Sequence, residues 1–320
     1  MIKIHNMANL NQVFDAISNG FLDYVPGDKF REVADINDAD IVFLAGALSQ
    51  GRLEFRMPQG LTPSFENMKT LADLYNALAD KPRIIWLDTM GPDLYHDPAL
   101  LDTETSGLTE KDVLVSPASL PPFPNLFTDV SHIEKSVFRP RSRFERVKSS
   151  VVMIYDQIVN AILDDVPVVD VLSDVMDVVS HLHITKTQTL RDDVVAGFGE
   201  SLSRVSYENL SYPQGVAYKL SQVEFALITS TRVGIEMMGV EAGMSGCQPI
   251  YPDTEFYRDI FDGTGVAFFD IKNPVESLRD IIQAGSNFDA KTTEAFRTKF
   301  SAEDTLPGFW DAVYALYAEE

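Results

Sequence analysis

Short hydrophobic runs alternate with amphipathic stretches through the first half of the chain. Residues 40–45 (DIVFLA) and 83–88 (RIIWLD) are dominated by apolar side chains, as strands are when a parallel sheet buries both of their faces. The stretch 65–80 between them carries apolar residues at helical spacing. The same patterns predict further strands at 1–5 and 112–116 and a helix at 9–20. Such alternation predicts a doubly wound α/β domain.

The alternation restarts at residue 151. Strands are predicted at 151–156, 183–188, 204–210, 224–230, 248–252 and 266–270, and helices at 190–202, 213–222, 234–246, 255–262 and 274–284. The last stretch, PGFWDAVYALYAEE, predicts an amphipathic helix with aromatic anchors at Trp310, Tyr314 and Tyr317. We therefore predict two Rossmann-like domains, 1–145 and 146–303, and a C-terminal helix, 304–320, that packs back on the first domain.

The composition is that of a folded chain of two domains. Its 320 residues are too many for one ordinary α/β domain, and the 45% that are hydrophobic suffice for a large core. Acidic residues number 48 and basic residues 26, which gives a formal charge of −22. This balance disfavours nonspecific binding to a polyanion, because neutralised phosphates supply most of the affinity for nucleic acids.

Cysteine usage and the N-terminus bear on the compartment. Cys247 is the only cysteine, so no internal disulfide can form and a reducing compartment is expected. The N-terminus lacks the apolar core of a signal peptide, and no apolar run reaches the roughly 18 residues that span a bilayer. We predict a cytoplasmic protein with no membrane partner.

A basic cluster stands out in this acidic chain. It lies in residues 131–150 and consists of Lys135, Arg139, Arg141, Arg143, Arg146 and Lys148. Two interpretations stay open: a solvated linker that balances acidic neighbours, or a surface that binds phosphates.

Residues 224–253 run as strand, tight turn, helix and strand. Thr231 lies in the turn and is a good N-cap type. The backbone amides of Gly234 and Ile235 are expected to be unpaired in the first helical turn, where they would bind a phosphate together with the helix dipole. Arg232, in the same turn, adds a charged donor.

The helix in this unit carries two carboxylates and several small residues. Glu236 and Glu241 are five residues apart, which puts them about 140° apart around a helix. One is therefore expected to contact the ligand and the other to lie along the rim. A carboxylate near a phosphate-binding helix start suits the hydroxyls of a ribose. Gly239, Gly243 and Gly246 are expected to keep the helix thin against the sheet.

Two motifs here resemble those of a known class of enzymes. Glu-Ala-Gly-Met-Ser-Gly-Cys-Gln-Pro (241–249) is followed by DGTGVAFFD (262–270), and this succession resembles the retaining glycosyltransferases of the GT-B fold. The resemblance implies two Rossmann-like domains with a cleft between them. It also implies that Glu241 holds the donor ribose, that the amides of Gly234 and Ile235 hold the diphosphate, and that no protein nucleophile is needed.

The chain departs from the usual pattern in one spacing. The first glutamate of that superfamily lies eight residues before the second, a position that Val233 occupies here, whereas Glu236 lies five before. That spacing, with AYKLSQVEFAL (217–227), resembles the DNA α-glucosyltransferases of T-even phages, whose donor is a UDP-sugar and whose acceptor is 5-hydroxymethylcytosine in duplex DNA. The resemblance covers residues 212–283. A packed helix–strand unit with two solvated glutamates is the alternative.

Further donor-site residues follow from where ligands bind in α/β sheets, beyond the carboxyl ends of the strands. Tyr207 is a candidate for contact with the base. Lys186 and Arg191 occupy the place where such enzymes carry basic residues on the diphosphate, whose negative charge they would stabilise as the bond breaks. Taken singly, either residue is better explained as a surface cation.

Candidates on the acceptor side lie in the first half. Asn6 and Asn9 follow the first strand, and Asp88 ends the strand 83–88, with His96 eight residues on. Asp88 is the candidate catalytic base that accepts the proton of the attacking hydroxyl; a turn-forming aspartate is the alternative. His96 is better explained as a polar loop residue than as a catalytic group.

The sequence therefore predicts a glycosyltransferase that moves a sugar, glucose or a pentose such as arabinose, from a UDP-sugar to an acceptor hydroxyl. The favoured acceptor is the hydroxymethyl group of 5-hydroxymethylcytosine in phage DNA, which would place the protein in the host cytoplasm. A glycan, lipid-linked or protein acceptor, or a noncatalytic binding protein, stays open. No motif supports a metal site or a permanently bound cofactor. Sugar, stereochemistry and oligomeric state are left open.

Overall fold

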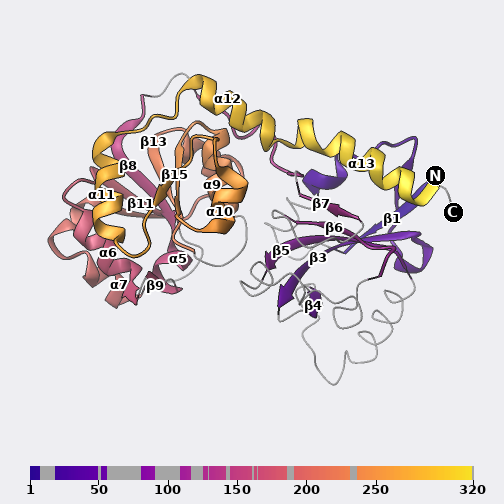
Figure 1. Ribbon diagram of the computed structural model, residues 1–320, viewed down its shortest axis with the longest axis horizontal. Coiled ribbons are helices and arrows are strands. Elements are labelled where there is room, and N and C mark those ends of the chain that lie inside the picture. Colours follow the sequence, from indigo (N-terminus) through magenta and orange to yellow (C-terminus); the bar gives the residue numbers. More distant parts are fainter. Residues whose placement is uncertain are drawn as a thin grey trace. The chain divides into compact units, whose positions relative to one another are not determined.

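The computed structural model describes most of the chain and divides it into two compact units (Figure 1). The first unit holds the described residues up to Glu134 together with 299–318, and the second those between Lys135 and Thr298. The described residues are 1–7, 19–49, 52–55, 81–90, 109–116, 125–128, 130–141, 145–160, 162–163, 165–185, 191–230 and 236–318.

The first unit is built on a largely parallel sheet. Its strands run in the order β2-β1-β3-β5-β6-β7, and β4 is paired antiparallel with β3. The strands are β1 (Ile2–Asn6), β2 (Phe30–Glu32), β3 (Ile41–Ser49), β4 (Arg52–Phe55), β5 (Arg83–Met90), β6 (Val113–Val115) and β7 (Leu126–Phe127), and η1 (Ile36–Asp38) is a 3-10 helix. The hydrophobic runs at 40–45 and 83–88 thus form β3 and β5 at the centre of the sheet. The predicted helix at 65–80, and nearly all of that at 9–20, lie outside the described residues.

The last helix, α13 (Ala302–Ala318), packs on this sheet and shares its core. Trp310 is fully buried, and its indole Nε1 donates a hydrogen bond to the Phe21 carbonyl at 2.9 Å. Its ring meets that of Phe30 edge-on, with 5.5 Å between centroids, and the rings of Phe309 and Phe127 lie 5.1 Å apart. These aromatic contacts hold residues nearly three hundred positions apart in one core.

The second unit contains an entirely parallel six-stranded sheet in the order β12-β11-β8-β13-β14-β15. Helices α6 and α11 lie on one side of its strands and α9 and α10 on the other (Figure 1), which is the doubly wound arrangement. The strands are β8 (Val147–Ile154), β11 (His181–Thr185), β12 (Val205–Glu208), β13 (Val223–Leu227), β14 (Gln248–Pro252) and β15 (Ala267–Phe269), with a small antiparallel pair, β9 (Ile162–Leu163) and β10 (Val166–Pro167).

The helices of the second unit connect these strands. They are α5 (Tyr155–Asn160), α6 (Val168–Val175), α7 (Asp192–Gly197), the 3-10 helix η3 (Gly199–Arg204), α8 (Gln214–Leu220), α9 (Met237–Met244), α10 (Glu255–Phe261), α11 (Pro274–Ala284) and α12 (Ala290–Lys299). The segment before β8 belongs to this unit as well, since Phe138 is buried and its ring lies 6.3 Å from that of Tyr212. The unit therefore begins at Lys135, eleven residues before the expected start at residue 146.

Small residues let α9 approach its neighbours closely. A Cβ atom added to Gly239 would come within 2.0 Å of the Tyr251 hydroxyl oxygen on β14, and one added to Gly243 within 2.5 Å of the Phe296 ring on α12. Larger side chains at these positions would push the helix off the sheet or displace the aromatic rings. Gly239 thus faces the sheet as predicted, whereas Gly243 faces α12 and Gly246 lies after the end of α9 with a φ of 77°.

Gly239→Ala should accordingly lower the free energy of unfolding by about 1–3 kcal/mol, the usual effect of overpacking a core. Chemical denaturation measures this. Gly308→Ala in α13 is the matched control, because a Cβ there meets nothing within 4 Å; it should raise stability by about 0.5–1 kcal/mol through helix propensity. An equally small effect at Gly239 would contradict the close approach of α9 to β14.

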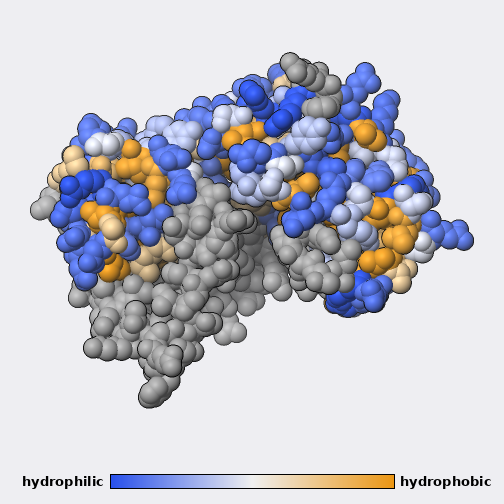
Figure 2. All heavy atoms as spheres, turned by 180° about the vertical axis from the view of Figure 1, so that it is seen from behind, coloured by the Kyte–Doolittle hydropathy of each residue, from blue (hydrophilic) through white to orange (hydrophobic). Residues whose placement is uncertain are grey.

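The coloured part of the surface in Figure 2 is mostly hydrophilic, with apolar side chains interspersed. The large apolar residues that are exposed come from many elements: Met1, Val147, Ile162, Val166, Leu202, Tyr218 and Leu316. Within the part of the chain that the structure describes, no helix has both the length and the apolar character needed to cross a membrane.

Candidate functional site

Helix α9 begins later than the sequence predicts. It spans Met237–Met244, and Glu236 is its N-cap residue, with an extended backbone (φ −71°, ψ 105°). The helix predicted at 234–246 is thus shorter at both ends, because Glu236 has left the helical conformation and the chain turns after Met244. Four predicted donor residues, Thr231, Arg232, Gly234 and Ile235, lie outside the described residues.

Glu241 is the most unusual side chain in this helix. It is only 3% exposed, and its Oε1 has no hydrogen-bond partner within the described residues. Burial raises the pKa of the Glu241 carboxyl to about 7, and a hydrogen bond from the Tyr212 hydroxyl opposes part of that rise. Buried polar atoms are almost always paired, so an unpaired carboxylate oxygen in the core marks a place where a ligand's donor would be stabilising. The alternative of a solvated glutamate is wrong for Glu241.

Glu236, the N-cap residue of α9, differs from Glu241 in its exposure. It is half-buried, and its backbone carbonyl accepts a hydrogen bond from the Tyr251 hydroxyl at 3.1 Å. Burial raises the pKa of Tyr251 well above its ordinary value, with smaller contributions from Tyr257, Glu236 and Glu241. Both carboxylates therefore lie within electrostatic reach of the Tyr251 hydroxyl.

Two hydrogen bonds also anchor Thr229 and Ser230, which follow β13. The Tyr257 hydroxyl, on α10, donates to the Ser230 carbonyl at 3.1 Å, and the Thr229 amide donates to the Gln157 side chain at 2.9 Å. These bonds fix the chain as it leaves the carboxyl end of β13, the edge of a parallel sheet at which ligands bind.

Two more predicted donor residues lie near that edge. Tyr207 is in β12; its hydroxyl is buried without a hydrogen-bond partner in the described part of the chain, and burial followed by Tyr155 raises its pKa. The Arg191 amide donates to the Tyr155 hydroxyl at 2.6 Å. Tyr155, which follows β8, is thus bonded to Arg191 and lies within electrostatic reach of Tyr207. Lys186 lies outside the described residues.

The guanidinium of Arg191 already has an ionic partner. It is 58% exposed and forms two hydrogen bonds with Asp193, at 3.0 and 2.5 Å, which raise the pKa of Arg191. A diphosphate would have to compete with this carboxylate. The sequence does not indicate this competition, because Asp193 is one of two neighbouring acidic residues in the first turn of α7.

The acceptor-side candidates lie in the first unit. Asn6 ends β1, and Asp88 lies within β5, two residues before its last residue, Met90. The strand is thus longer than the predicted 83–88. Since β3 pairs with both β1 and β5 in parallel, Asn6 and Asp88 lie toward the same edge of the sheet. Asn9 and His96 lie outside the described residues.

Part of the basic cluster is directed into the protein. The Arg146 guanidinium donates to the carbonyls of Leu220, Val223 and Ser245 at 3.0, 2.7 and 2.5 Å, and burial lowers its pKa. Arg141 lies over the ring of Tyr218, 5.7 Å from its centroid. Arg146 therefore fastens β8 to its neighbours and is not a phosphate ligand, a role that charge counting alone cannot reveal.

The positions of the His, Cys, Asp and Glu side chains bear on metal and thiol chemistry. Among the described residues no three His, Cys, Asp or Glu side chains are placed to hold a metal ion together. Cys247 is fully buried, and burial raises the pKa of its thiol to about 12, so its sulfur is a packed group and not a nucleophile.

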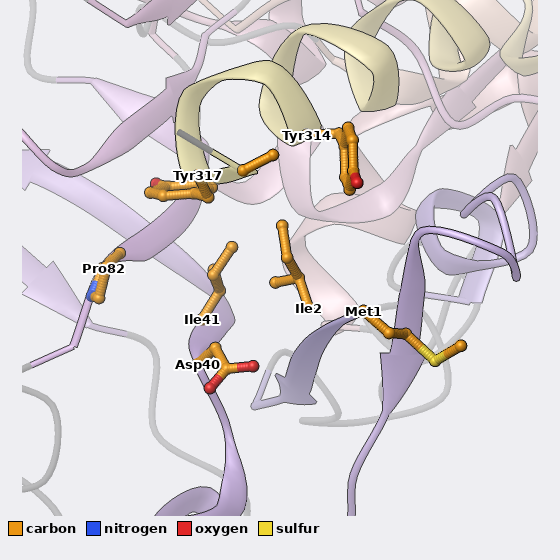
Figure 3. A pocket seen from close by; sticks show the side chains of 8 residues that line it. Met1, Ile2, Asp40, Ile41, Pro82, Tyr314 and Tyr317 are labelled. Atoms are coloured by element: carbon orange, nitrogen blue, oxygen red, sulfur yellow. The ribbon is translucent and has the colours of Figure 1, made fainter. Parts of the chain in front are cut away.

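A cavity of about 340 Å³ opens in the first unit, but at the opposite edge of the sheet (Figure 3). Its walls are the residues that precede or begin β1, β3 and β5, and the end of α13 covers it. The lining residues are Met1, Ile2, Asp40, Ile41, Pro82, Tyr314, Tyr317 and Ala318. Ligands of open α/β sheets bind beyond the carboxyl ends, so this cavity at the amino ends is not the expected site.

Comparisons with known proteins identify the fold. No protein-family model matches the chain, and no curated protein matches its sequence. Several solved structures do match. One is sucrose-phosphate synthase from Thermosynechococcus elongatus, with a TM-score of 0.62, 11% sequence identity and 100% of both chains covered. Another is Anabaena HepE in complex with UDP and glucose, with a TM-score of 0.58, 9% sequence identity and 100% of both chains covered. The chain has the GT-B fold. S. aureus TarM in complex with UDP also matches (0.52, 13%, 76% of this chain), although the chain spans only 53% of its length.

Identities this low establish the GT-B fold alone. The finer resemblance to DNA α-glucosyltransferases stays a prediction, as do the individual site residues. Sequence reasoning also missed three tyrosines, Tyr155, Tyr212 and Tyr251, whose hydroxyls join the predicted residues. Their partners are distant in sequence, and nothing in the local pattern distinguishes these tyrosines from packing residues.

Proposed function

We propose that the chain is a UDP-sugar-dependent glycosyltransferase whose second unit binds the donor. The observation that carries this proposal is the buried Glu241 carboxylate, one of whose oxygens has no hydrogen-bond partner among the residues that the structure describes, on the helix that follows the carboxyl end of β13 in a GT-B fold. Three of its structural neighbours are named for complexes with UDP or for sugar transfer, which agrees with a nucleotide-sugar donor.

The chemistry of a ribose suits this carboxylate. The 2′- and 3′-hydroxyls are hydrogen-bond donors, and an ionised carboxylate is the strongest acceptor that a side chain offers. Since Oε1 is shielded from solvent in the free protein, donor binding must be accompanied by a local movement that opens it. The bound ribose then replaces an unpaired buried oxygen with a charge-assisted hydrogen bond.

The remaining donor contacts are assigned from the sequence pattern. The amides of Gly234 and Ile235, with Thr231 and Arg232, would hold the diphosphate, and Glu236 would lie along the rim. Lys186 and Arg191 would stabilise the charge that develops on the departing UDP, and Tyr207 would face the base. On the acceptor side, Asp88 would take the proton of the attacking hydroxyl, with Asn6, Asn9 and His96 lining the approach.

The proposed acceptor is 5-hydroxymethylcytosine in duplex DNA, reached by flipping the nucleotide out of the stack. The spacing of Glu236 and Glu241 and the segment 217–227 support it. A glycan acceptor is the second candidate, favoured by the formal charge of −22 and by the inward direction of Arg146. Both acceptors require the same donor site.

Binding of UDP is the first test. At a UDP concentration a hundredfold above its dissociation constant, we expect stabilisation by about 2.7 kcal/mol, seen as a rise in Tm, with ADP as the control nucleotide. Incubation with hydroxymethylcytosine duplex, unmodified duplex and a panel of UDP-sugars, followed by nucleoside mass measurement, then tests the acceptor. UDP binding with both duplexes untouched would shift the assignment to a glycan; no response to UDP or any UDP-sugar would leave a noncatalytic protein.

A further inference from the structure

Helix α8 meets the two outermost strands on one side of the second sheet in a cluster of polar side chains. His183 lies in β11, Ser206 and Glu208 lie in β12, and Lys219 is in the last turn of α8. These side chains are largely shielded from solvent, with exposures of 16% for His183, 28% for Glu208 and 13% for Lys219. None of them belongs to the proposed donor site.

A single carboxylate oxygen holds the cluster together. The Glu208 Oε1 accepts hydrogen bonds from the Lys219 Nζ at 2.7 Å and from the Ser206 hydroxyl at 3.1 Å. It also lies 3.0 Å from the His183 Nδ1. Because an ionised carboxylate can only accept, Nδ1 must carry a proton and donate it to this oxygen. The ring nitrogen that takes up a further proton is therefore Nε2.

Protonation of His183 would put two cations against this one oxygen. The Lys219 Nζ and the His183 Nδ1 are only 3.4 Å apart, and the ring centroids of His181 and His183 are separated by 4.4 Å. Among the described residues, the titratable groups that act on His183 are thus Lys219 from α8, Glu208 from β12 and His181 from its own strand. Like charges this close disfavour each other's ionised forms. Glu208 can hold Lys219 beside a neutral His183, but not beside a protonated one.

We propose that His183, Glu208 and Lys219 form an acid-sensitive latch, which fastens α8 to the sheet at neutral pH and releases it when His183 takes up a proton. Helix α8 packs against β13 and α9, the strand and the helix that carry the proposed donor site. The latch is a conformational device of the second unit, and it does not depend on the function proposed for that unit.

The direction of the pH dependence follows from the surroundings of the two titrating groups. Burial lowers the pKa of His183 below its ordinary value of 6.5; the hydrogen bond with Glu208 opposes this, whereas Lys219 and His181 add to it. Burial alone would raise the pKa of Glu208, but its hydrogen bonds with Lys219 and His183 hold that pKa below 4.5. The latched state therefore binds the His183 proton less readily than the released state. Its stability is complete above pH 6.5 and is lost as pH falls below that value.

Hydrogen exchange of the α8 amides, followed by mass spectrometry and corrected for its intrinsic pH dependence, measures the latch directly. Between pH 7.5 and pH 5.5 we expect the protection of α8 in the unaltered protein to fall by about three- to tenfold, because one proton is taken up below the ordinary histidine pKa. Protection in α11, a helix of the same unit, should change by less than about twofold, since no group of the latch lies on it.

Two variants each remove one of the competing cations. Lys219→Met should reduce the fall in α8 protection to less than about twofold and raise the pKa of His183 in an NMR titration, because the imidazolium can then pair with Glu208 undisturbed. His183→Gln should reduce the fall equally, because the glutamine amide still donates but does not titrate; it tests the latch even if Lys219→Met does not fold. Lys291→Met, which removes an exposed lysine from α12, is the matched control and should leave the fall unchanged.

Three results would overturn the latch. The first is constant protection of α8 across this pH range in the unaltered protein. The second is an equal fall in α11, which would show a general loss of stability in acid. The third is a fall in α8 protection that persists at full size in His183→Gln or in folded Lys219→Met, since the competition between the two cations would then have no part in it.

Discussion

Glu241→Gln is expected to stabilise the free protein at pH 8 and to weaken its binding of UDP. The folded-state pKa of Glu241 is about 7, above its ordinary value of 4.5, because burial penalises the charge. The unfolded chain therefore releases this proton near pH 4.5 and the folded protein only near pH 7. Stability from this group is complete below pH 4.5 and is lost as pH rises through 7.

The size of the stabilisation expected from Glu241→Gln follows from the difference between the folded-state and unfolded-state pKa values of Glu241. Each unit corresponds to about 1.4 kcal/mol, so ionisation of Glu241 costs the folded state about 3 kcal/mol at pH 8. Glutamine has nearly the same shape as glutamate but no charge. Glu241→Gln should therefore raise the free energy of unfolding at pH 8 by most of these roughly 3 kcal/mol, which urea denaturation measures. At pH 4.5 the two proteins should differ little. The buried carboxylate is thus destabilising in the free protein, which is typical of a binding group.

The same change should weaken UDP binding by about 10- to 150-fold, the equivalent of 1.5–3 kcal/mol for a hydrogen bond to a charged group. Titration calorimetry at pH 8 measures it. Glu276→Gln is the matched control, since Glu276 is exposed in the first turn of α11 and should change neither quantity appreciably. A Glu241→Gln protein that gains stability yet binds UDP normally would identify Glu241 as a core group with no part in the site.

Hydrophobic patterning predicts the fold well where strands are buried on both faces. The runs at 40–45, 83–88 and 224–230 lie in central strands, because such strands must be apolar along their whole length. The close approach of α9 to the sheet at Gly239 could also be predicted, because a helix that lies so near a sheet has no room for a side chain at the point of contact. The apolar strands and the glycine in α9 can both be predicted because each feature depends on the residues of a single short segment.

The site is less predictable because its residues act through partners far along the chain. Glu241 is recognisable from its motif, but Tyr212 is not, since a tyrosine before a proline has no local mark of a contact 29 residues away. Arg146 belongs to a conspicuous basic cluster, yet it binds three backbone carbonyls. Composition identifies charges, whereas only tertiary structure shows what each of them faces.

Asp112→Ala is expected to cause the largest loss of stability in the first unit. Asp112 is fully buried at the start of β6 and faces Arg83 at the start of β5, with side-chain exposures of 0% and 7%. It accepts hydrogen bonds from the Arg83 Nε at 2.8 Å and the Thr109 amide at 2.7 Å, and it is paired with the Arg83 Nη2. The ion pair thereby joins two adjacent strands at their amino ends.

Removing the aspartate would take away the carboxylate that the buried Arg83 guanidinium contacts through Nε and Nη2. Breaking a buried pair in this way costs about 3–5 kcal/mol, whereas replacing both partners by apolar residues is often neutral. Asp112→Ala should therefore lower the free energy of unfolding by that amount in chemical denaturation, and the double variant Arg83→Met with Asp112→Leu should recover most of it. High salt should change the result little, because buried charges are poorly screened.

The position of the Arg83–Asp112 ion pair determines whether its loss should affect UDP binding. Asp112 lies at the amino ends of its sheet, whereas the proposed donor site is in the second unit. At a temperature where Asp112→Ala is still folded, its dissociation constant for UDP should equal that of the unaltered protein. A loss below 1 kcal/mol would show that the pair does not hold β5 against β6. Weakened UDP binding by the folded variant would instead place Asp112 in the donor machinery, which its location in the first unit argues against.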